Sequence, residues 1–444
     1  MKHFKLFALA LLFAFGGSVY SQWTFCAGSS QMLGLGNNPC IWTVNTSTCW
    51  VGGGATGSPR VFRTTNSGNN FSNVSGNLTG GQIYAICALS DQVCFVGDGG
   101  PNALLWRTTN GGTNWTLMLS TGGSVGFFNG IARGHNNPNF LFAESDAPTG
   151  SGPHYIAMST NGGMNWTSST APVPCGAIGA AGAVYCVDNM FFGFGMSLTA
   201  SYGYTTNGGT TWNCQSFSVA GTFSSGVAWN TNKMNGVFAT NQSNSNVSIV
   251  TGGPGSSMQT VSTGTGNSTL TVCRFVPNTN ICFIGGTFPA ANGSIRMSTN
   301  NGASGSWVTM TTAGLTSWFD LGFTIDGGNI IGYAISTAGA VRLQTPVGIN
   351  PINNEIPSKF VLEQNYPNPF NPSTVVKYSI PKSGYVSLNV FNSVGQEVKT
   401  IVSEQQAAGN YQFIIDLDGF SSGVYFYTLT ADGFKETKKM LLVK

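Results

Sequence analysis

The sequence predicts an all-β chain that consists of a repetitive body and a smaller β-domain at its C-terminus. The composition combines 61 glycines and 12% aromatic residues with only 7% charged residues, which is typical of short strands joined by glycine turns rather than of a disordered chain. A phrase of the form Thr-Asn-Gly-Gly-x-x-Trp recurs along the body, and apolar residues alternate in the C-terminal region. The net charge of +3 over 444 residues is too small to indicate a nucleic-acid partner.

The repeated phrase defines the body. It reads RTTNGGTNW at residues 107–115 and recurs as RTTNSGNNF, MSTNGGMNW, YTTNGGTTW and MSTNNGASGSW. Successive central asparagines lie 44, 51, 46 and 93 residues apart, so a degenerate copy is expected near residue 253, where SIVTGG supplies a strand and two glycines. Three strand-like runs precede each copy, and seven such triplets follow one another, from CIWTVN, TCWVGGG and RVFRTTN to WFDLGFTI, IIGYAIS and AVRLQT. Because a period in the forties with short strands is typical of propeller blades, residues 22–345 are predicted to form a seven-bladed β-propeller.

The aromatic residue that ends each phrase is expected to begin the fourth strand of its blade. These residues are Phe71, Trp115, Trp166, Trp212 and Trp307. The fifth and seventh units have no clear aromatic residue at this position. Because Gln22-Trp23-Thr24 resembles Asn114-Trp115-Thr116, we expect Trp23 to supply the outer strand of the last blade. Such a strand would close the ring and remove its free edges.

The phrase also has the chemistry of a turn. Glycine permits positive φ angles, an asparagine side chain can bond backbone amides two residues further on, and the aromatic side chain can bury apolar surface between blades. The phrase resembles the Asp-box of sialidases, sortilin-type receptors and related propellers, with asparagine in place of aspartate. This resemblance implies that the box is structural and lies on the face opposite an active site. The box residues are Asn66, Asn110, Trp115, Asn161, Trp166, Asn207, Trp212, Asn300 and Trp307.

The C-terminal region differs from the body in composition. Residues 22–355 carry 16 charged residues in 334 positions, whereas residues 356–444 carry 15 in 89, and prolines punctuate the boundary. Its alternating runs predict a small antiparallel β-sandwich. These runs are Val386, Leu388 and Val390; Tyr411, Phe413 and Ile415; and Val424, Phe426 and Thr428.

The same region carries specific motifs. The segments FVLEQNYPNPFNPST, SVGQEV, AAGNY, SSGVYFYTL and KKMLLVK, within residues 359–444, resemble the type A C-terminal sorting domain of the Bacteroidetes-type type IX secretion system. The resemblance implies an Ig-like β-sandwich that the secretion machinery recognises for passage through the outer membrane. It also implies removal of the domain by a sortase-like peptidase and attachment to the cell surface. A carbohydrate-binding or adhesive Ig-like module is the alternative.

The N-terminus predicts export. Lys2 and Lys5 precede the apolar run Leu6–Phe15, which is too short to span a bilayer, and the small residues before Gln22 fit a cleavage site. No later segment is long and apolar enough to span a membrane. We therefore expect a protein that is secreted or attached to the outer-membrane surface after periplasmic transit. The expected organisation is a signal peptide over residues 1–21, a propeller over 22–345, a linker over 346–358 and a sorting domain over 359–444.

Ten cysteines fit an oxidising compartment. Three pairs flank short turns between strand-like runs, and each pair is a candidate disulfide within one hairpin. These pairs are Cys40 with Cys49, Cys87 with Cys94, and Cys273 with Cys282. The remaining cysteines, whose pairing the sequence leaves open, are Cys26, Cys175, Cys186 and Cys214.

Two small sets of residues are candidates for a functional site. Paired carboxylates can catalyse glycoside hydrolysis or bind calcium through their oxygens, and solvated loop charges are the plainer alternative. No cofactor other than calcium is indicated. The candidate acids are Asp98, Glu144, Asp146 and Asp320, and the candidate ligand-binding face comprises Arg133, His135, His154 and Trp318. A repeated register in the third strands favours a structural role for Arg63, Arg107, Arg296 and Arg342.

The sequence favours a secreted or cell-surface binding scaffold without catalysis, whose ligand is a glycan or a protein. The rival hypothesis is a secreted glycoside hydrolase, sialidase- or xyloglucanase-like. A sialidase resemblance would require a Phe/Tyr-Arg-Ile-Pro motif and an arginine triad, neither of which is assembled here. A third class, an assembly factor resembling the photosystem-associated propellers, fits poorly with outer-membrane export.

Overall fold

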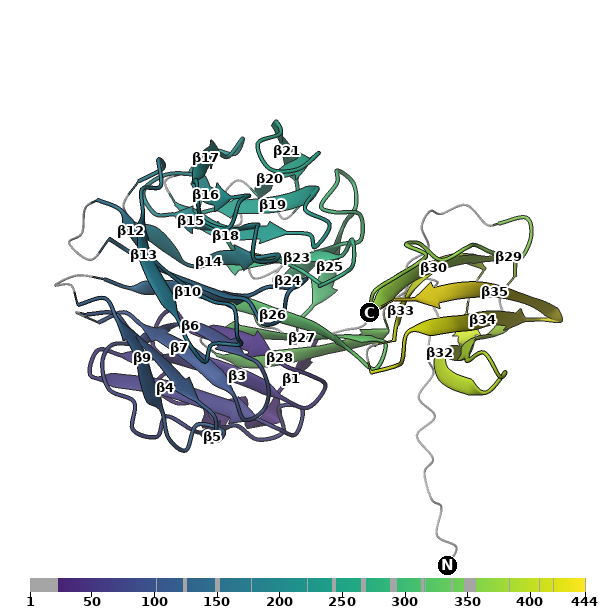
Figure 1. Cartoon of the computed structure of the whole chain (residues 1–444), viewed down its shortest axis with the longest axis horizontal. Helices are drawn as coiled ribbons and strands as arrows, with labels where there is room; N and C mark the ends of the chain where they lie inside the picture. Colours follow the sequence, from purple (N-terminus) through teal and green to yellow (C-terminus); the bar gives the residue numbers. More distant parts are fainter. Residues whose placement is uncertain are drawn as a thin grey trace, which may run out of the picture.

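Two β-rich bodies make up the protein (Figure 1). The structure is a computed structural model that describes residues 23–443 apart from 101, 123–125, 148–151, 177, 222, 242–244, 265–268, 288–293, 313–314, 316, 337, 347–356, 383, 407 and 418. The predicted signal peptide lies outside the described residues. Within the described part of the chain, no helix combines the length and the apolar character needed to cross a membrane.

The larger body is a propeller. Among the described residues, seven four-stranded antiparallel sheets follow one another as blades, and their first strands lie innermost, so the predicted seven-bladed fold is confirmed. Blade 1 comprises β2 (Cys40–Thr43), β3 (Cys49–Ala55), β4 (Ser58–Thr64) and β5 (Ser72–Asn73), and blade 2 comprises β6 (Ile83–Ala88), β7 (Cys94–Asp98), β8 (Leu104–Thr108) and β9 (Thr116–Ser120). Blade 3 comprises β10 (Phe128–Arg133), β11 (Leu141–Ser145), β12 (His154–Ser159) and β13 (Thr167–Ala171). Blade 4 comprises β14 (Gly179–Cys186), β15 (Phe192–Met196), β16 (Ser201–Thr205) and β17 (Asn213–Ser216).

The remaining blades include the degenerate copy near residue 253. Blade 5 comprises β18 (Ser224–Trp229), β19 (Asn235–Thr240), β20 (Asn246–Thr251) and β21 (Met258–Ser262). Blade 6 comprises β22 (Thr269–Phe275), β23 (Cys282–Thr287), β24 (Ser294–Ser298) and β25 (Trp307–Thr311). Blade 7 comprises β26 (Asp320–Asp326), β27 (Asn329–Ser336), β28 (Gly339–Pro346) and, from the N-terminus, β1 (Thr24–Phe25), which a short 3₁₀ helix, η1 (Ala27–Gln31), follows.

The N-terminal strand closes the ring, as predicted. Thr24 and Phe25 pair with Arg342 and Val341 of β28. Trp23 precedes this strand and is only 2% exposed. Its ring packs edge to face against Phe283 of blade 6 and Phe323 of blade 7, with ring centroids 6.1 Å and 5.9 Å apart. A buried aromatic residue thus fastens the strand at the junction of two blades.

The repeated phrase forms the turn between the third and fourth strands. In blade 2, the Thr108 hydroxyl accepts a hydrogen bond from the Gly112 amide at 2.9 Å and donates to Asn110 Oδ1 at 3.0 Å. Asn110 Oδ1 also accepts from the Asn114 amide at 3.0 Å, and Asn66, Asn161 and Asn207 make the equivalent bond. The expectation of a bond to the amide two residues on is therefore wrong. Two successive glycines at positive φ, such as Gly111 at 71° and Gly112 at 89°, widen the turn and bring the fourth amide to the side chain.

Each of these turns also contacts the turn between the first and second strands of its own blade. Gly111 donates to the Gln92 carbonyl at 3.0 Å, Gly162 to Asn139 at 2.8 Å and Gly208 to Met190 at 3.1 Å. The end of the propeller where these turns meet is called the box face below. The turns between second and third strands and the connections between blades lie on the opposite face.

The three predicted hairpin disulfides are absent, because all six of those cysteines are free and buried. In blade 1, Cys40 faces Gly52 and Cys49 faces Thr43, so the odd spacing between Cys40 and Thr43 turns the two thiols to opposite sides of the sheet. Cys87 and Cys94 are offset by one residue in the pairing of their strands, so their side chains also point to opposite sides of the sheet. Cys273 and Cys282 are offset by two residues, so they share a side of the sheet but are not directly opposite each other. The disulfide in the described structure joins Cys175 to Cys214, in the connection before β14 and in β17; Cys26 and Cys186 are free.

The smaller body is a β-sandwich with a core of its own. One sheet has the order β29 (Val361–Leu362), β30 (Ser373–Ile380) and β33 (Gly409–Asp416), and the other the order β32 (Glu397–Gln406), β31 (Gly384–Phe391), β34 (Gly423–Ala431) and β35 (Phe434–Leu442). Most of the predicted alternating residues are buried, but in β34 the core face carries Tyr425, Tyr427 and Leu429, whereas Val424 is 38% exposed. Burial of these tyrosines is allowed because their hydroxyls donate to the carbonyls of Ser421 at 2.9 Å and Glu363 at 2.8 Å.

Candidate binding site in the central channel

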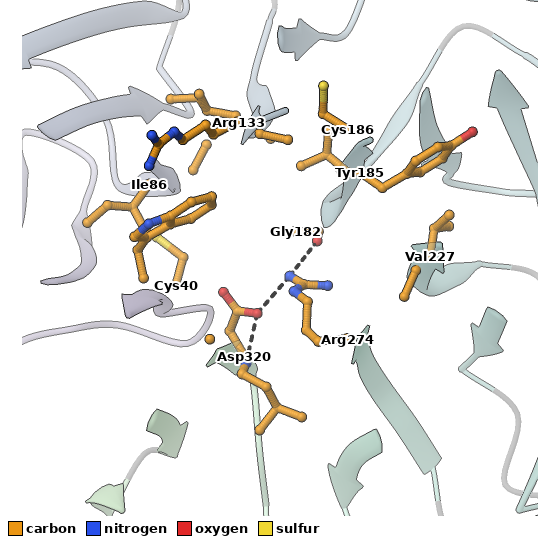
Figure 2. A pocket seen from close by; sticks show the side chains of 18 of the residues that line it. Cys40, Ile86, Arg133, Gly182, Tyr185, Cys186, Val227, Arg274 and Asp320 are labelled. Atoms are coloured by element: carbon orange, nitrogen blue, oxygen red, sulfur yellow. Dashed lines mark hydrogen bonds and ion pairs between the residues drawn. The ribbon is translucent and has the colours of Figure 1, made fainter. Parts of the chain in front are cut away.

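A cavity of about 120 Å³ lies where the innermost strands surround the propeller axis (Figure 2). On the same measure of cavity volume, one buried water needs roughly 10–15 Å³. The cavity therefore has room for a ligand group of several heavy atoms. Its wall is formed largely by aliphatic residues and backbone, with aromatic side chains from several blades. These aromatic residues are Trp42, Tyr84, Tyr185, Trp229, Phe275 and Phe323.

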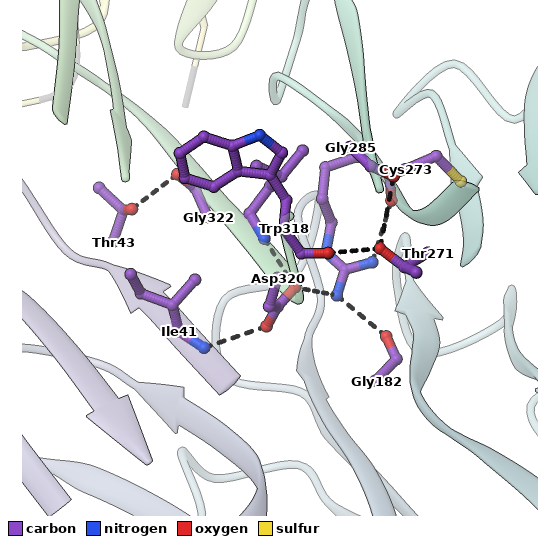
Figure 3. Close-up of polar contacts among 11 residues, drawn as sticks. Ile41, Thr43, Gly182, Thr271, Cys273, Gly285, Trp318, Asp320 and Gly322 are labelled. Atoms are coloured by element: carbon purple, nitrogen blue, oxygen red, sulfur yellow. Dashed lines mark hydrogen bonds and ion pairs between the residues drawn. The ribbon is translucent and has the colours of Figure 1, made fainter. Parts of the chain in front are cut away.

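An ion pair between two neighbouring blades lines the channel. Arg274 of β22 and Asp320 of β26 meet at 2.7 Å between a guanidinium nitrogen and Oδ1, and the same guanidinium nitrogen donates to the Gly182 carbonyl of blade 4 at 2.9 Å (Figures 2 and 3). Gly182 presents this carbonyl because β14 bulges between Gly179 and Val184 and Gly182 has a φ of 75°. Arg274 therefore links blade 6 to blades 4 and 7.

Asp320 also fastens the junction of blades 7 and 1. Its Oδ2 accepts a hydrogen bond from the Ile41 amide of β2 at 3.0 Å, and its Oδ1 accepts from its neighbour Leu321 at 2.9 Å (Figure 3). Burial raises the pKa of the Asp320 carboxyl, and Arg274 and the two amides only partly offset this effect. The carboxylate is thus fully used by the framework around the channel.

A second arginine lines the channel without such a partner. Arg133 ends β10, and its Nε donates to the Pro138 carbonyl at 3.0 Å. None of the ion pairs among the described residues includes Arg133. His135 follows in the same loop, and its amide donates to the Cys186 carbonyl of blade 4 at 3.4 Å. Both residues lie at the box face, because their loop carries Asn139, which contacts the box turn of blade 3.

Three of the other candidates form a buried cluster between blades 3 and 4. His154 Nδ1 lies 2.7 Å from Glu144 Oε1, and both side chains are completely buried. His154 Nε2 lies 3.0 Å from the Gly176 carbonyl, beside the Cys175–Cys214 disulfide. Asp146 Oδ1 accepts from Asn129 Nδ2 at 2.7 Å and from the Gly179 amide at 2.8 Å. Gly179 is required here, because a Cβ would lie 2.6 Å from both Asn129 Nδ2 and Glu144 Oε1.

The contacts of His154 fix its protonation. A carbonyl oxygen can only accept, so Nε2 carries a proton, and Nδ1 then either donates to a Glu144 carboxylate or accepts from a Glu144 carboxylic acid. Burial opposes the charged imidazole, but the hydrogen bond and charge of Glu144 outweigh it and raise the pKa of His154. Burial likewise raises the pKa of Glu144. The pair therefore holds one proton between its two groups, and neither ring nitrogen is available to a substrate.

The last candidate acid stands alone. Asp98 ends β7 and is completely buried; its Oδ2 accepts from the Gly81 amide at 2.8 Å and its Oδ1 from the Leu104 amide at 2.6 Å. Burial raises the pKa of this carboxyl, and the amide bonds only partly oppose it. Asp98 thus holds the turn between β7 and β8 and lies in a different blade from the other acids.

The structure separates the predicted ligand-binding face. Arg133 and His135 lie at the box face, whereas His154 is buried towards the opposite face in the cluster described above. Trp318 is only 1% exposed, and its amide donates to the Gly286 carbonyl of blade 6 at 3.0 Å. The expectation that these four residues share one ligand-binding surface is therefore wrong, because the end of a first strand and the start of a third strand lie at opposite ends of a blade. No group of three or more metal-ligating side chains within the described structure is arranged to hold an ion.

Sequence reasoning missed Arg274 and Asn129. It considered arginines of the third strands, where Arg63, Arg107 and Arg342 stack over the aromatic residue opposite on the second strand, with guanidinium carbons 5.2–5.8 Å from the ring centroids of Trp50, Phe95 and Tyr333. Arg296 departs from this pattern, because it faces Ile284. The signal that was available for Arg274 is a charged residue inside TVCRFVP, an otherwise apolar innermost strand.

The comparisons with known proteins agree with this architecture. Residues 364–444 match the family described as the secretion system C-terminal sorting domain. No curated protein matches the chain in sequence. The chain is similar in structure to PorZ, a bacterial surface component of the type IX secretion system of Porphyromonas gingivalis, with 12% identity, a TM-score of 0.52 and coverage of 91% of this chain and 59% of PorZ.

Two further solved structures are similar. An ancestral GH74 enzyme shares 15% identity, with a TM-score of 0.50 and coverage of 95% of this chain and 64% of the enzyme. YCF48 from Cyanidioschyzon merolae shares 14% identity, with a TM-score of 0.47 and coverage of 73% of this chain and 96% of YCF48. At such identities, the likeness to PorZ and to the GH74 enzyme concerns the fold alone, and the chain spans less than two thirds of either. The protein is therefore a β-propeller that carries a type IX secretion C-terminal sorting domain and is secreted or attached to the cell surface.

Proposed function

We propose that the propeller is a non-catalytic binding scaffold that displays a ligand site, for a glycan or a protein, outside the outer membrane. The observation that carries this proposal is the state of the four candidate acids. Asp98 and Glu144 are completely buried, and Asp146 and Asp320 are 9% and 8% exposed. Each accepts hydrogen bonds from the backbone or side chains that hold blades or turns together.

Glycoside hydrolysis needs two carboxyl groups that flank a substrate bond, one as acid and one as base or nucleophile. Here the acid in the channel is paired with Arg274, and the buried cluster presents a histidine whose two nitrogens are both engaged. A group that must stay in its structural bonds is a poor general acid or base, because proton transfer requires contact with the reacting atoms. This arrangement supports binding over turnover.

The export side of the proposal adds detail to the matched sorting domain. We expect residues 1–21 to act as a signal peptide and residues 346–358 to link the propeller, residues 22–345, to the sorting domain, residues 359–444. The secretion machinery and its sortase-like peptidase are the expected partners of that domain. The box residues are assigned to the framework of the propeller.

The decisive experiment exposes the purified full-length chain to a glycan array and to immobilised outer-membrane and extracellular proteins, together with a panel of chromogenic glycosides. Saturable binding without product release supports the proposal. Turnover of any glycoside that persists in an Asp320→Asn variant and disappears in Glu144→Gln would replace it with the hydrolase hypothesis. An absence of binding to every array would reject the scaffold.

A further inference from the structure

The charges that line the central channel do not balance. Arg274 and Asp320 neutralise each other on one side of the cavity, whereas Arg133 lines the same cavity without a carboxylate partner among the described residues. Figure 2 shows Arg133 across the pocket from the Arg274–Asp320 pair. The propeller has very few charged residues. An arginine without an ionic partner among the residues that line its cavity is therefore not part of a generally charged surface.

An acid that lies beside the loop of Arg133 already has its own partners. Asp188, in the turn after β14, accepts hydrogen bonds from the amides of Met190 at 2.9 Å and Phe191 at 3.0 Å, and its second oxygen pairs with Lys233. Burial opposes the charge of Asp188, but Lys233 and the amides outweigh it and lower the pKa. Asp188 is therefore held by its own loop and by blade 5, and it leaves the Arg133 charge uncompensated.

The Arg133 side chain is held by its own loop. Its Nε is bound to the Pro138 carbonyl within the same loop, which fixes the plane of the guanidinium. Two terminal nitrogens remain, and an arginine offers them as a fork that matches the two oxygens of a carboxylate. The side chain is half-buried, so a charge-assisted bond formed there is screened less than on an open surface.

His135 adds a neutral polar group beside Arg133. The residue is exposed at the channel mouth, and the protein atoms around its ring together with the Arg133 charge lower its pKa to about 4. The imidazole is therefore uncharged at neutral pH and can donate or accept one hydrogen bond. Trp42 and Tyr84, which are both partly exposed, contribute aromatic side chains to the lining of the same cavity.

We propose that Arg133 and His135 form a subsite at the box-face end of the channel that binds the carboxylate of a small acidic ligand group. The inference rests on the proposed binding function and specifies its ligand chemistry. One carboxylate would neutralise the single unmatched charge of the cavity, and the aromatic walls suit the apolar face of a sugar ring, so a sugar acid is the favoured source of that carboxylate. The Arg274–Asp320 pair closes the wall on the opposite side.

The test uses the full chain and two matched ligand pairs. D-glucuronate is compared with its neutral amide, and acetyl-trialanine acid with acetyl-trialanine amide, in equilibrium titrations followed by saturation-transfer NMR. The wild-type protein is expected to prefer the acid of the sugar pair, and Arg133→Met is expected to weaken that binding by roughly tenfold to a hundredfold while leaving the amide unchanged. Arg60→Met, which removes the same charge from a third strand away from the channel, is the matched control.

A second variant and thermal melting of every protein used distinguish a loss of the binding site from a loss of folding. Arg133→Lys keeps the charge but not the fork, so it is expected to retain part of the acid preference. An Arg133-dependent preference for the peptide acid supports the carboxylate subsite and assigns its source to a chain terminus. Equal binding of acid and amide in both pairs, or equal acid binding by Arg133→Met and Arg60→Met, overturns the subsite. If an array ligand binds and Arg133→Met does not alter it, the subsite fails and the scaffold function stands.

Discussion

The propeller and the sorting domain use charge in different ways. The propeller region, residues 22–355, carries 16 charged residues in 334 positions, and several of these are structural: Asp98 holds a turn, Arg274 and Asp320 bridge blades, and Glu144 sits against His154. The sorting domain carries almost as many charges in 89 positions, and the ion pairs described there, Lys382 with Asp432 and Lys438 with Glu436, lie near its surface. Charges buried in a sparse framework are each costly to remove, whereas exposed pairs contribute little to stability.

The two regions also differ in how much of their function can be inferred from the sequence. The sorting domain is identified by contiguous motifs on its own strands, and its buried tyrosines keep their hydroxyls bonded to backbone carbonyls. The propeller assembles its channel from one strand of each blade, so residues distant in sequence become neighbours. Removing part of either region should therefore have distinct and measurable consequences.

The largest expected effect is loss of export. Deleting Ile356–Lys444 should leave a folded propeller in the periplasm of the native host, because every strand of its described blades lies before this segment and the matched sorting domain lies within it. Cell fractionation with surface-protease shaving measures the outcome, and fusion of the same segment to a neutral periplasmic protein is the control. Surface display of the truncated chain would show that the domain is not the export signal and would favour an adhesive module.

The next effect concerns the box. Trp115 is 3% exposed, stacks edge to face on Trp50 of blade 1 at 6.3 Å and donates through Nε1 to the Val74 carbonyl at 3.0 Å. Trp115→Ala should cost about 3–5 kcal/mol of unfolding free energy, and Asn110→Ala about 1 kcal/mol. Asn110→Asp keeps the acceptor for the Asn114 amide and should change stability least. Denaturant unfolding and ligand titration decide the framework role, which fails if a variant loses binding while its unfolding curve is unchanged.

A similar or slightly smaller effect is expected when the ion pair between Arg274 and Asp320 is broken. Arg274→Met leaves the buried Asp320 carboxylate without its cation, which should destabilise the propeller by about 3 kcal/mol. Arg274→Met combined with Asp320→Asn removes both charges while an oxygen can still accept from the Ile41 amide, so the double variant should be more stable than Arg274→Met. Thermal and denaturant unfolding measure the coupling. Additive losses in the double variant would mean that the pair does not act as a unit.

The features predicted from sequence are those encoded locally. The box turns, the strand order within a blade and the sorting domain depend on neighbouring residues, and even the closing strand was found because Trp23 resembles the local context of Trp115. The predicted disulfides failed because a register of one residue turns Cys40 and Cys49 to opposite sides of the sheet. The channel was beyond local patterns: Arg274, Asp320 and the Gly182 carbonyl meet only when the ring closes, and the bulge that exposes this carbonyl has no unique sequence signal. Arg133 was predicted as a ligand-binding residue, but it lies at the box face and not on the opposite face with His154 and Trp318.

The smallest effect is a pH dependence that arises from the pair of His154 and Glu144. Both groups have raised pKa values in the folded protein, so the fold binds more protons than the unfolded chain above the ordinary pKa of each group, which is 4.5 for Glu144 and 6.5 for His154. The stabilisation from His154 is therefore complete below pH 6.5 and is lost as the pH rises through the folded pKa. One linked proton changes the unfolding free energy by at most about 1.4 kcal/mol per pH unit. Removal of the titrating ring should flatten this slope.

His154→Gln tests the idea, because its amide can still donate to the Gly176 carbonyl or to Glu144 but cannot take up a proton. Unfolding free energies from denaturant titrations between pH 6 and 9 should fall with pH for the wild-type protein and fall less for His154→Gln. The pKa of His135 already lies in the acidic range, so His135→Gln is the matched control and should keep the wild-type slope above pH 6.5. Parallel slopes for wild type and His154→Gln would mean that the shared proton leaves stability unchanged. The buried pair would then contribute little to stability through its charge, like the exposed pairs of the sorting domain.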